Sequence, residues 1–427
     1  MSWSALPAPR APVASVSLWQ VAIVFIAACA LSTGAAWPFD AVFARGITLW
    51  WVQLAALAAL VAMLVVAPSG RKAFMVAWGF ATVWLSTTFW WLFIAIHTYG
   101  GLPAWLGLLA IVALAAALGL YYAVAGWAFW HTRQAAPVWL ALGFAALWTM
   151  AELARGTWLT GFGWGAVGYA HLDGPLAAYF PWVGSYGVGG LAAGVAAALA
   201  LLLLRRAWGS ALLAALLLGA PLVWPSAWGQ WSQPTGRLGV TLLQGNIPQD
   251  EKFETGSGVP LALQWYAAQL QASASDLVVA PETAVPLLPQ QLPDGYWQAL
   301  AQRFGRGPGA ALIGIPLGSY AEGYTNSVLG LAPGQAQAWR YDKHHLVPFG
   351  EFIPPLFKWF TRMMNIPLGD FNRGALGQPS LPVKTERVAA NICYEDLYGE
   401  ELASRFLDPA QAPTVLSLIH ISEPTRL

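Results

Sequence analysis

Long apolar stretches separated by short polar turns fill the first half of the chain. Each is close to the ~20 residues that a helix needs to cross a bilayer. The stretches predict transmembrane helices at residues 18–36, 41–66, 74–96, 104–130, 138–154, 176–204 and 211–228. The first is long for a signal peptide and further spans follow it, so we expect it to be retained. We therefore expect a membrane domain of about seven transmembrane helices over residues 1–230.

The pattern changes after Ser232, where short β-rich runs alternate with helical ones. Strands are predicted at residues 237–247, 277–280, 311–317, 326–331, 337–341, 387–392 and 412–417, and helices at 259–273 and 294–304. Such alternation is typical of an α/β domain or of a layered αββα sandwich. We expect this domain over residues 231–418.

Composition strengthens the membrane prediction. Of the 427 residues, 57% are hydrophobic and only 10% are charged, whereas soluble proteins carry roughly 25% charged residues. The formal net charge of +1 and the lack of a basic cluster in the sequence give no indication of nucleic acid binding. The two cysteines, Cys29 and Cys393, lie in such different contexts that they predict no disulfide framework.

Positive charges in the short loops predict the orientation of the helices. Arg10, Arg71, Arg133 and Arg205 fall before the first span and after the second, fourth and sixth. Because positive loops face the cytoplasm, we expect a cytoplasmic N-terminus. Seven spans then place residues 231–418 on the far side of the membrane, whereas an even number would leave them in the cytoplasm.

Polar residues interrupt the apolar region near residue 155. Glu152 and Arg155 lie three positions apart, so they share a helix face and can pair. Both a functional role and interfacial anchoring remain open for them. The glycine-rich segment 161–165 predicts a re-entrant or surface loop whose aromatic side chains lie at headgroup level.

Three chemically complementary residues end or follow predicted strands. Cys393 lies between the strand at 387–392 and a segment, 397–402, that can begin a helix, and helix N–H groups lower the pKa of a thiol. Taken alone, Cys393 is equally consistent with a buried structural thiol. Glu282 and Lys343 supply what a nucleophilic thiol needs, namely a base for its proton and a cation for an oxyanion.

The motifs around these residues resemble the three signatures of the nitrilase superfamily, in that family's order. They are Pro281–Ala284, Tyr341–Lys343 with Leu346–Pro354, and Asn391–Glu395. Fused behind a multi-span membrane domain, they resemble the apolipoprotein N-acyltransferase family of the bacterial inner membrane. The resemblance extends to Tyr99–Gly101, Glu152–Phe162 and Leu243–Gln249.

The resemblance implies a role for each matching residue. Glu282 is expected to be the general base, Lys343 to stabilise the oxyanion, and Cys393 to accept the acyl group. Glu351 and Glu395 match acidic positions of the family's active site.

For Glu351 and Glu395, a salt bridge that holds Lys343 or a loop remains the alternative.

Tyr394 matches an aromatic position of the active site. Phe253 stands where the family usually has a tryptophan, which keeps an apolar contact and loses an indole N–H.

The implied reaction is a ping-pong acyl transfer, the last step of lipoprotein maturation. A membrane phospholipid donates a fatty acyl chain to Cys393 as a thioester intermediate. The α-amine of a diacylglyceryl-cysteine on an apolipoprotein then accepts it. The resemblance implies no metal and no organic cofactor, and it places the catalytic domain on the periplasmic side of the inner membrane.

Two segments near the end of the chain carry separate expectations. The apolar segment 352–360 is a candidate lipid-contacting arm, with an ordinary amphipathic helix as the alternative. Residues 419–427 show no resemblance to the family and are interpreted as an unrelated tail, which implies a truncated catalytic domain whose activity is open.

Two other functions are consistent with parts of the pattern. A membrane-anchored nitrilase-type amidase would use the same Glu282, Lys343 and Cys393, but the resemblance at 152–162 favours acyl transfer. A membrane transporter or scaffold is the alternative from another class, although the spans show neither mid-span polar residues nor an inverted repeat.

Overall fold

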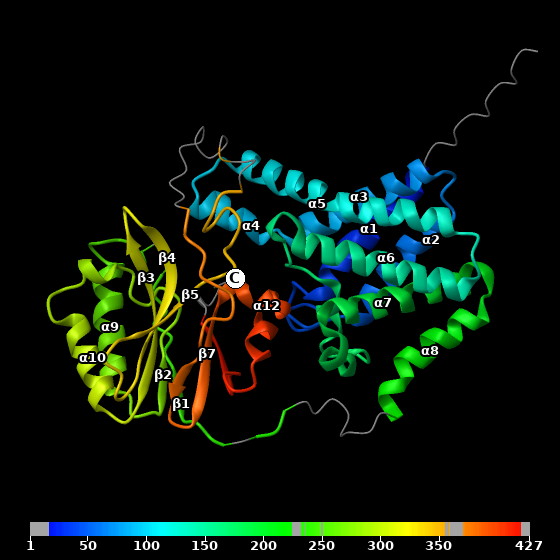
Figure 1. Cartoon of the computed structure of the whole chain (residues 1–427). Helices are drawn as coiled ribbons and strands as arrows, with labels where there is room; N and C mark the ends of the chain where they lie inside the picture. The colour runs from blue at the N-terminus through cyan, green and yellow to red at the C-terminus, as the bar shows by residue number, and fades with distance from the viewer. Residues whose placement is uncertain are drawn as a thin grey trace, which may run out of the picture. The chain divides into compact units, whose positions relative to one another are not determined.

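The computed structural model describes residues 17–223, 232–234, 236–248, 251–354, 358 and 370–419. The chain forms two compact units, Met1–Gln233 and Pro234–Leu427. Each unit is described by itself, and Figure 1 labels their helices and strands.

The first unit consists of apolar helices, as the hydrophobic pattern predicts. They are α1 (Leu18–Ala35), α2 (Trp50–Val65), α3 (Gly70–Thr88), α4 (Trp91–Phe93), α5 (Ala104–Thr132), α6 (Pro137–Thr157), α7 (Phe180–Arg205) and α8 (Trp208–Val223). Shorter turns of helix are η1 (Ile94–Tyr99), η2 (Trp158–Thr160), η3 (Val167–His171) and η4 (Ala177–Tyr179). Each predicted span overlaps one of the longer helices, although α2 begins only at Trp50 instead of residue 41, and residues 224–228 of the last span lie outside the described residues.

Not every helix is long enough to span a bilayer alone. Among the described residues, 4 helices are long and apolar enough, and a fifth span results if α3 and the segment Trp91–Tyr99, bent by 56°, count as one. Helices α2 and α8 have 16 residues each. The chain is thus a membrane protein, and seven spans remain a prediction.

The charged pair Glu152 and Arg155 is buried inside this unit rather than exposed at an interface. Both side chains are fully enclosed, and their nearest N and O atoms lie 4.0 Å apart. Arg155 donates to the carbonyls of Phe162 and Trp164 at 2.7 and 2.6 Å. Phe162 packs against Phe89 with ring centroids 4.9 Å apart and is buried, so its ring faces the protein interior, and the headgroup level of this loop stays a prediction. The buried guanidinium therefore provides hydrogen bonds to two carbonyls of the loop that follows η2.

The second unit contains two sheets in its described part. One has the order β1-β2-β3-β4-β5, with strands Val240–Leu242, Leu277–Val279, Ala310–Ser319, Gly323–Leu331 and Trp339–Asp342. Strands β1, β2 and β3 are parallel, whereas β3, β4 and β5 are antiparallel. The other has the order β6-β7-β8, with strands Leu381–Val383, Glu386–Ile392 and Val415–Ile419.

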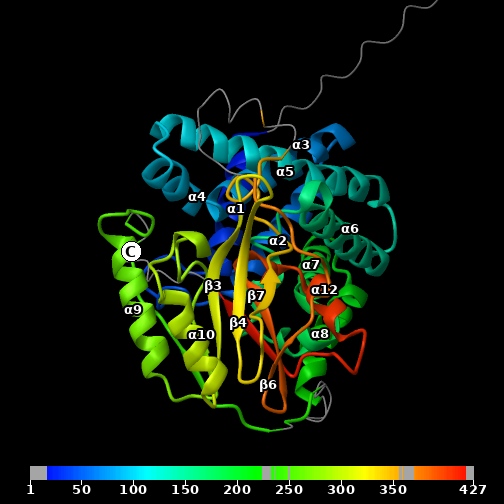
Figure 2. The ribbon, with the colours of Figure 1, turned by 60° about the vertical axis from the view of Figure 1, so that its left-hand side comes forward.

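The sheets pack face to face between helices. Apolar side chains such as Val279 and Val328 of the first sheet share a core with Val388 and Ile392 of the second. Helices α9 (Gly258–Ala272) and α10 (Tyr296–Arg306) cover the other face of the first sheet (Figures 1 and 2). Helix α12 (Gly399–Ala403) and η8 (Ser404–Phe406) accompany the second sheet. The expected αββα sandwich is therefore confirmed.

Two details differ from the predicted strands. The strand expected at 237–247 is reduced to β1, and Asn246, inside the expected range, has a left-handed φ of 48° that an extended strand does not contain. Strand β6 was not predicted, because Pro382 stands at its centre. Among the described strands, β6 pairs only with β7, so it lies at the edge of the sheet. An edge strand can contain proline because one of its sides needs no N–H donors.

Candidate active site

Three strands end where the predicted catalytic residues begin. Glu282 follows β2, Lys343 follows β5 and Cys393 follows β7. Thr283 and Cys393 have positive φ values of 49° and 52°, a conformation that costs non-glycine residues about 1–3 kcal/mol each. Such strain is typical of turns that present a functional side chain.

Gly314 on β3 allows the Glu282 turn to come close to the sheet. A Cβ at this position would lie 2.2 Å from the carbonyl oxygen of Pro281 and 2.8 Å from Cα of Glu282. No side chain fits at these distances, so glycine is required where the carboxylate is positioned.

The ammonium of Lys343 lies between two carboxylates. Its Nζ is 2.9 Å from Oε1 of Glu351 and 3.4 Å from Oε1 of Glu282. The Lys343 side chain is only 1% exposed. Removing one member of a buried pair leaves an uncompensated charge, at a cost of roughly 3–5 kcal/mol.

Asn326 on β4 ties the same two carboxylates together. Its Nδ2 donates to Glu282 Oε1 at 2.6 Å and to Glu351 Oε1 at 2.7 Å. The sequence patterns do not single out this residue. The available signal is an amide between Thr325 and Ser327 in a predicted strand, where a buried polar side chain needs partners.

Charges around Cys393 set the protonation of its thiol. Burial raises the pKa of Cys393 to about 12, and the Glu282 carboxylate adds to the rise. The Lys343 ammonium and the N–H of Tyr394 lower this pKa but are outweighed. The expected lowering by helix N–H groups is therefore present but minor, and the thiol needs a base to become a nucleophile.

The charge state of Lys343 suits an anion-stabilising role. Burial lowers its pKa, but the carboxylates of Glu282 and Glu351 together outweigh burial. The pKa therefore lies above the ordinary value of 10.5, and the ammonium remains charged at neutral pH.

Glu351 is fixed by its own loop as well as by Lys343. Its Oε2 accepts from the N–H of Val347 at 2.8 Å, and its own N–H donates to the carbonyl of Val347 at 2.9 Å. This geometry fits the alternative of a carboxylate that holds Lys343, and it leaves Glu351 within the same charged cluster.

Glu395 holds the backbone around the site. Its Oε1 accepts from the N–H groups of His344 at 2.7 Å and His345 at 3.3 Å, and its Oε2 accepts from the N–H of Ile392 at 2.8 Å. Tyr341 donates its hydroxyl to the same carboxylate at 2.8 Å. Because these partners flank both Lys343 and Cys393, Glu395 fixes the two loops relative to each other.

Tyr394 is packed rather than exposed to a substrate. Its side chain is 2% exposed, and its hydroxyl accepts from Tyr398 at 2.8 Å. The two tyrosines and His345 form a cluster of rings. Tyr394 therefore supports the turn that follows Cys393.

Lys252, which the sequence patterns do not single out, is a second buried cation beside Glu282. Its Nζ donates to the main-chain carbonyl of Glu282 at 3.1 Å. The neighbouring Phe253 is 58% exposed.

Of the predicted arm at 352–360, residues 355–357 and 359–360 lie outside the described residues. Within the described ranges, no three His, Cys, Asp or Glu side chains form a metal-binding group.

Comparisons with known proteins agree with this arrangement. Residues 31–198 match the family described as apolipoprotein N-acyltransferase N-terminal domain, and residues 239–418 match carbon-nitrogen hydrolase. A relative from Verminephrobacter eiseniae, named apolipoprotein N-acyltransferase, is 51% identical over 93% of this chain and 76% of its own length. A relative of the same name from Ralstonia nicotianae is 43% identical over 86% of this chain and 71% of its own length.

A solved carbon-nitrogen hydrolase from Helicobacter pylori is also similar, at 17% identity over 43% of this chain and 59% of that one, with a TM-score of 0.28. The sequence relatives match both the helical unit and the unit that carries Cys393. By this similarity over most of its length, the chain belongs to the apolipoprotein N-acyltransferase family.

Proposed function

We propose that this protein transfers a fatty acyl chain from a membrane phospholipid to the N-terminal α-amine of a diacylglyceryl-cysteine on an apolipoprotein. The family supports an N-acyltransferase that acts on lipoproteins and is associated with a membrane. The observation that carries the mechanism is the cluster of Glu282, Lys343 and Glu351, whose charges act on the Cys393 thiol. Nucleic acid has no place in this reaction.

In the first half-reaction, Cys393 becomes acylated. Its thiol proton passes to the Glu282 carboxylate as Sγ attacks the ester carbonyl carbon of the phospholipid. The Lys343 ammonium stabilises the negative charge on the carbonyl oxygen. The new C–S bond forms, the ester C–O bond breaks, and Glu282 returns the proton to the departing lysophospholipid oxygen.

In the second half-reaction, the acyl group moves to nitrogen. The free α-amine of the lipoprotein cysteine attacks the thioester carbonyl, and Lys343 again faces the oxyanion. The C–N bond forms and the C–S bond breaks, while one amine proton passes through Glu282 to the Cys393 sulfur. Glu351 and Asn326 keep the two charged groups in place during both steps.

The location of this chemistry follows from the membrane helices. We propose seven spans and a cytoplasmic N-terminus, which puts the Cys393 unit on the periplasmic face of the inner membrane. Both substrates carry acyl chains that are embedded in the membrane. A catalytic unit joined to membrane helices therefore stays close to both of them.

Intact mass spectrometry tests the acyl transfer. Purified protein in detergent is incubated with a phospholipid, and the masses of the wild type and of Cys393→Ala are compared. We expect an acyl-sized increase on the wild type alone, which a diacylglyceryl-cysteine peptide removes while it gains the same mass. An adduct that water discharges as fast as the peptide does would favour an amidase-like hydrolase and contradict the transferase.

A further inference from the structure

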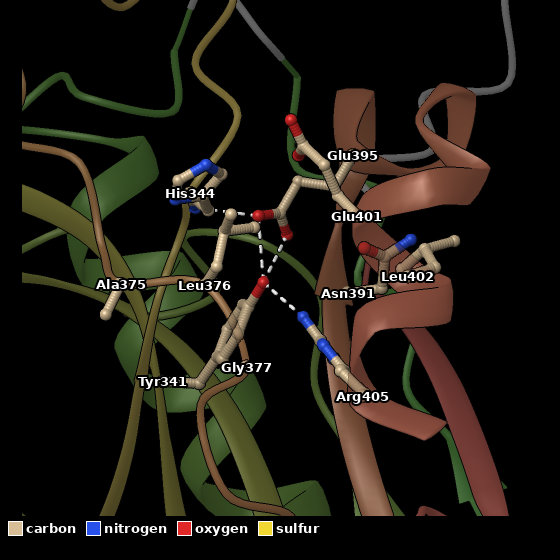
Figure 3. Close-up of a pocket in the computed structure, with 10 residues that line it drawn as sticks. All are labelled: Tyr341, His344, Ala375, Leu376, Gly377, Asn391, Glu395, Glu401, Leu402 and Arg405. Carbon is tan, nitrogen blue, oxygen red and sulfur yellow. Dashed lines mark hydrogen bonds between the residues drawn. The ribbon is translucent and has the colours of Figure 1, made fainter. Parts of the chain in front are cut away.

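A small cavity lies beside the end of β7, between Tyr341 of β5 and helix α12. Its lining residues are Tyr341, His344, Ala375, Leu376, Gly377, Asn391, Glu395, Glu401, Leu402 and Arg405. Figure 3 shows the Asn391 amide at the margin of this cavity, which Glu395, Tyr341 and Arg405 also border. All of these residues belong to the second unit.

Asn391 is the unusual member of this lining. Its side chain is 0% exposed, and within the described residues neither Nδ2 nor Oδ1 has a hydrogen-bond partner. A buried amide with two unsatisfied atoms is costly, and native proteins rarely keep one without a hidden partner.

The remaining polar groups of the cavity satisfy one another. The Tyr341 hydroxyl donates to Glu395 and accepts from Arg405 at 2.5 Å. The Glu401 carboxylate accepts from His345 Nδ1 at 2.8 Å. Arginine, tyrosine and glutamate side chains in this lining include both hydrogen-bond donors and acceptors.

The size of the cavity selects the ligand. The space available to the centre of a water molecule is about 10 Å³, close to the ~10–15 Å³ that one water needs. A larger organic ligand does not fit. The Arg405 guanidinium disfavours a metal cation, and the carboxylates of Glu395 and Glu401 disfavour an anion.

We propose that one ordered water molecule occupies this cavity and completes the hydrogen bonds of Asn391. A single water can accept from Nδ2–H and donate to Oδ1 of the same amide, and the charged lining provides further partners. Asn391 lies two residues before Cys393, and Glu395 binds the intervening N–H of Ile392. The water therefore supports the strand end from which the nucleophile projects.

Whether Asn391→Leu lowers or raises the thermal midpoint of unfolding tests the proposed water site. This test does not depend on the proposed function. Asn391→Leu removes both polar atoms at nearly constant volume. If water satisfies the amide, the variant loses those bonds and its thermal midpoint falls by roughly 3–10 °C. If the cavity is dry, the variant removes an unsatisfied amide and its midpoint is unchanged or rises, which would overturn the proposal.

A direct measurement covers the case in which Asn391→Leu fails to fold. A high-resolution density map of the unmodified full chain should show a water peak within hydrogen-bond distance of both Asn391 amide atoms. An empty cavity in that map would overturn the proposal. Asn372→Leu serves as the matched control, because Asn372 donates from an exposed position to the carbonyl of Glu322 and should change the midpoint little.

Discussion

At the scale of single residues, the surroundings keep Lys343 positively charged and keep the Cys393 thiol protonated. The carboxylates that surround Lys343 favour its ammonium form, whereas burial and one of the same carboxylates, Glu282, favour the protonated form of Cys393. A protonated thiol is protected from unwanted reaction until a substrate ester arrives. In the proposed mechanism, the carboxylate of Glu282 then serves as the base.

Alkylation of the thiol by iodoacetamide measures this balance, in a Cys29→Ala background so that Cys393 alone reports. Because the pKa of Cys393 is raised to about 12, we expect slow alkylation at neutral pH and a rate that still rises at pH 10. Glu282→Gln removes a charge that raises this pKa, so its profile should shift to lower pH although acyl transfer is lost. Lys343→Met removes a charge that lowers it and should shift the profile upward.

Equal pH profiles of alkylation for the two variants would contradict the assigned charges.

The raised pKa of Cys393 also affects the stability of the fold. An unfolded thiol with the ordinary pKa of 9.0 ionises before the folded one does. The free energy of unfolding should therefore fall as pH rises from 9.0 toward about 12.

Asn326 provides a second prediction at this scale. Asn326→Leu removes the amide that donates to both Glu282 and Glu351. Hydrogen bonds to charged groups contribute about 1.5–3 kcal/mol, so we expect kcat to fall roughly 10- to 100-fold while KM changes little. Steady-state kinetics with Asn372→Leu as the control measures this effect. A change confined to KM would show that Asn326 contacts substrate instead.

At the scale of elements, the strand ends carry the site. Apolar β-rich runs predicted β2, β3, β4, β5 and β7, and therefore the positions of Glu282, Lys343 and Cys393. The sequence does not predict which buried polar side chain meets the carboxylates, because Asn326 lies 44 residues from Glu282 along the chain. It also does not predict that Glu395 binds main-chain N–H groups, since such contacts depend on the loops.

Gly314 tests whether the approach of two elements positions the base. Gly314→Ala places a Cβ against the carbonyl of Pro281, so the turn that carries Glu282 must move. We expect a loss of acyl transfer and a lower thermal midpoint. Gly305→Ala is the matched control, because nothing lies within 4 Å of its Cβ and alanine favours helix α10. Equal activity in both variants would show that the turn tolerates displacement.

At the scale of the whole molecule, a helical membrane unit is joined to a unit that matches the carbon-nitrogen hydrolase family. The hydrophobic pattern predicts this division well, because spanning helices and alternating strands differ so strongly in composition. The number of spans is harder to predict. Helices α2 and α8 are short, and α3 continues into a bent segment.

Labelling from outside the cell membrane measures the orientation that seven spans imply. In a background of Cys29→Ala and Cys393→Ala, Tyr320→Cys introduces a single thiol at a position that is 96% exposed in the catalytic unit. We expect a membrane-impermeant maleimide to label it in spheroplasts and to leave Arg71→Cys unlabelled. The reverse result would place the catalytic unit in the cytoplasm and imply an even number of spans.

The most direct test of the central claim is to locate the acyl group after reaction with a phospholipid alone. The protein is digested, and the peptide that contains Cys393 is examined by mass spectrometry before and after neutral hydroxylamine, which cleaves thioesters. We predict an acyl group on Cys393 that hydroxylamine removes, and none in Glu282→Gln. An acyl group on another residue, or transfer to the lipoprotein amine by Cys393→Ala, would contradict the account.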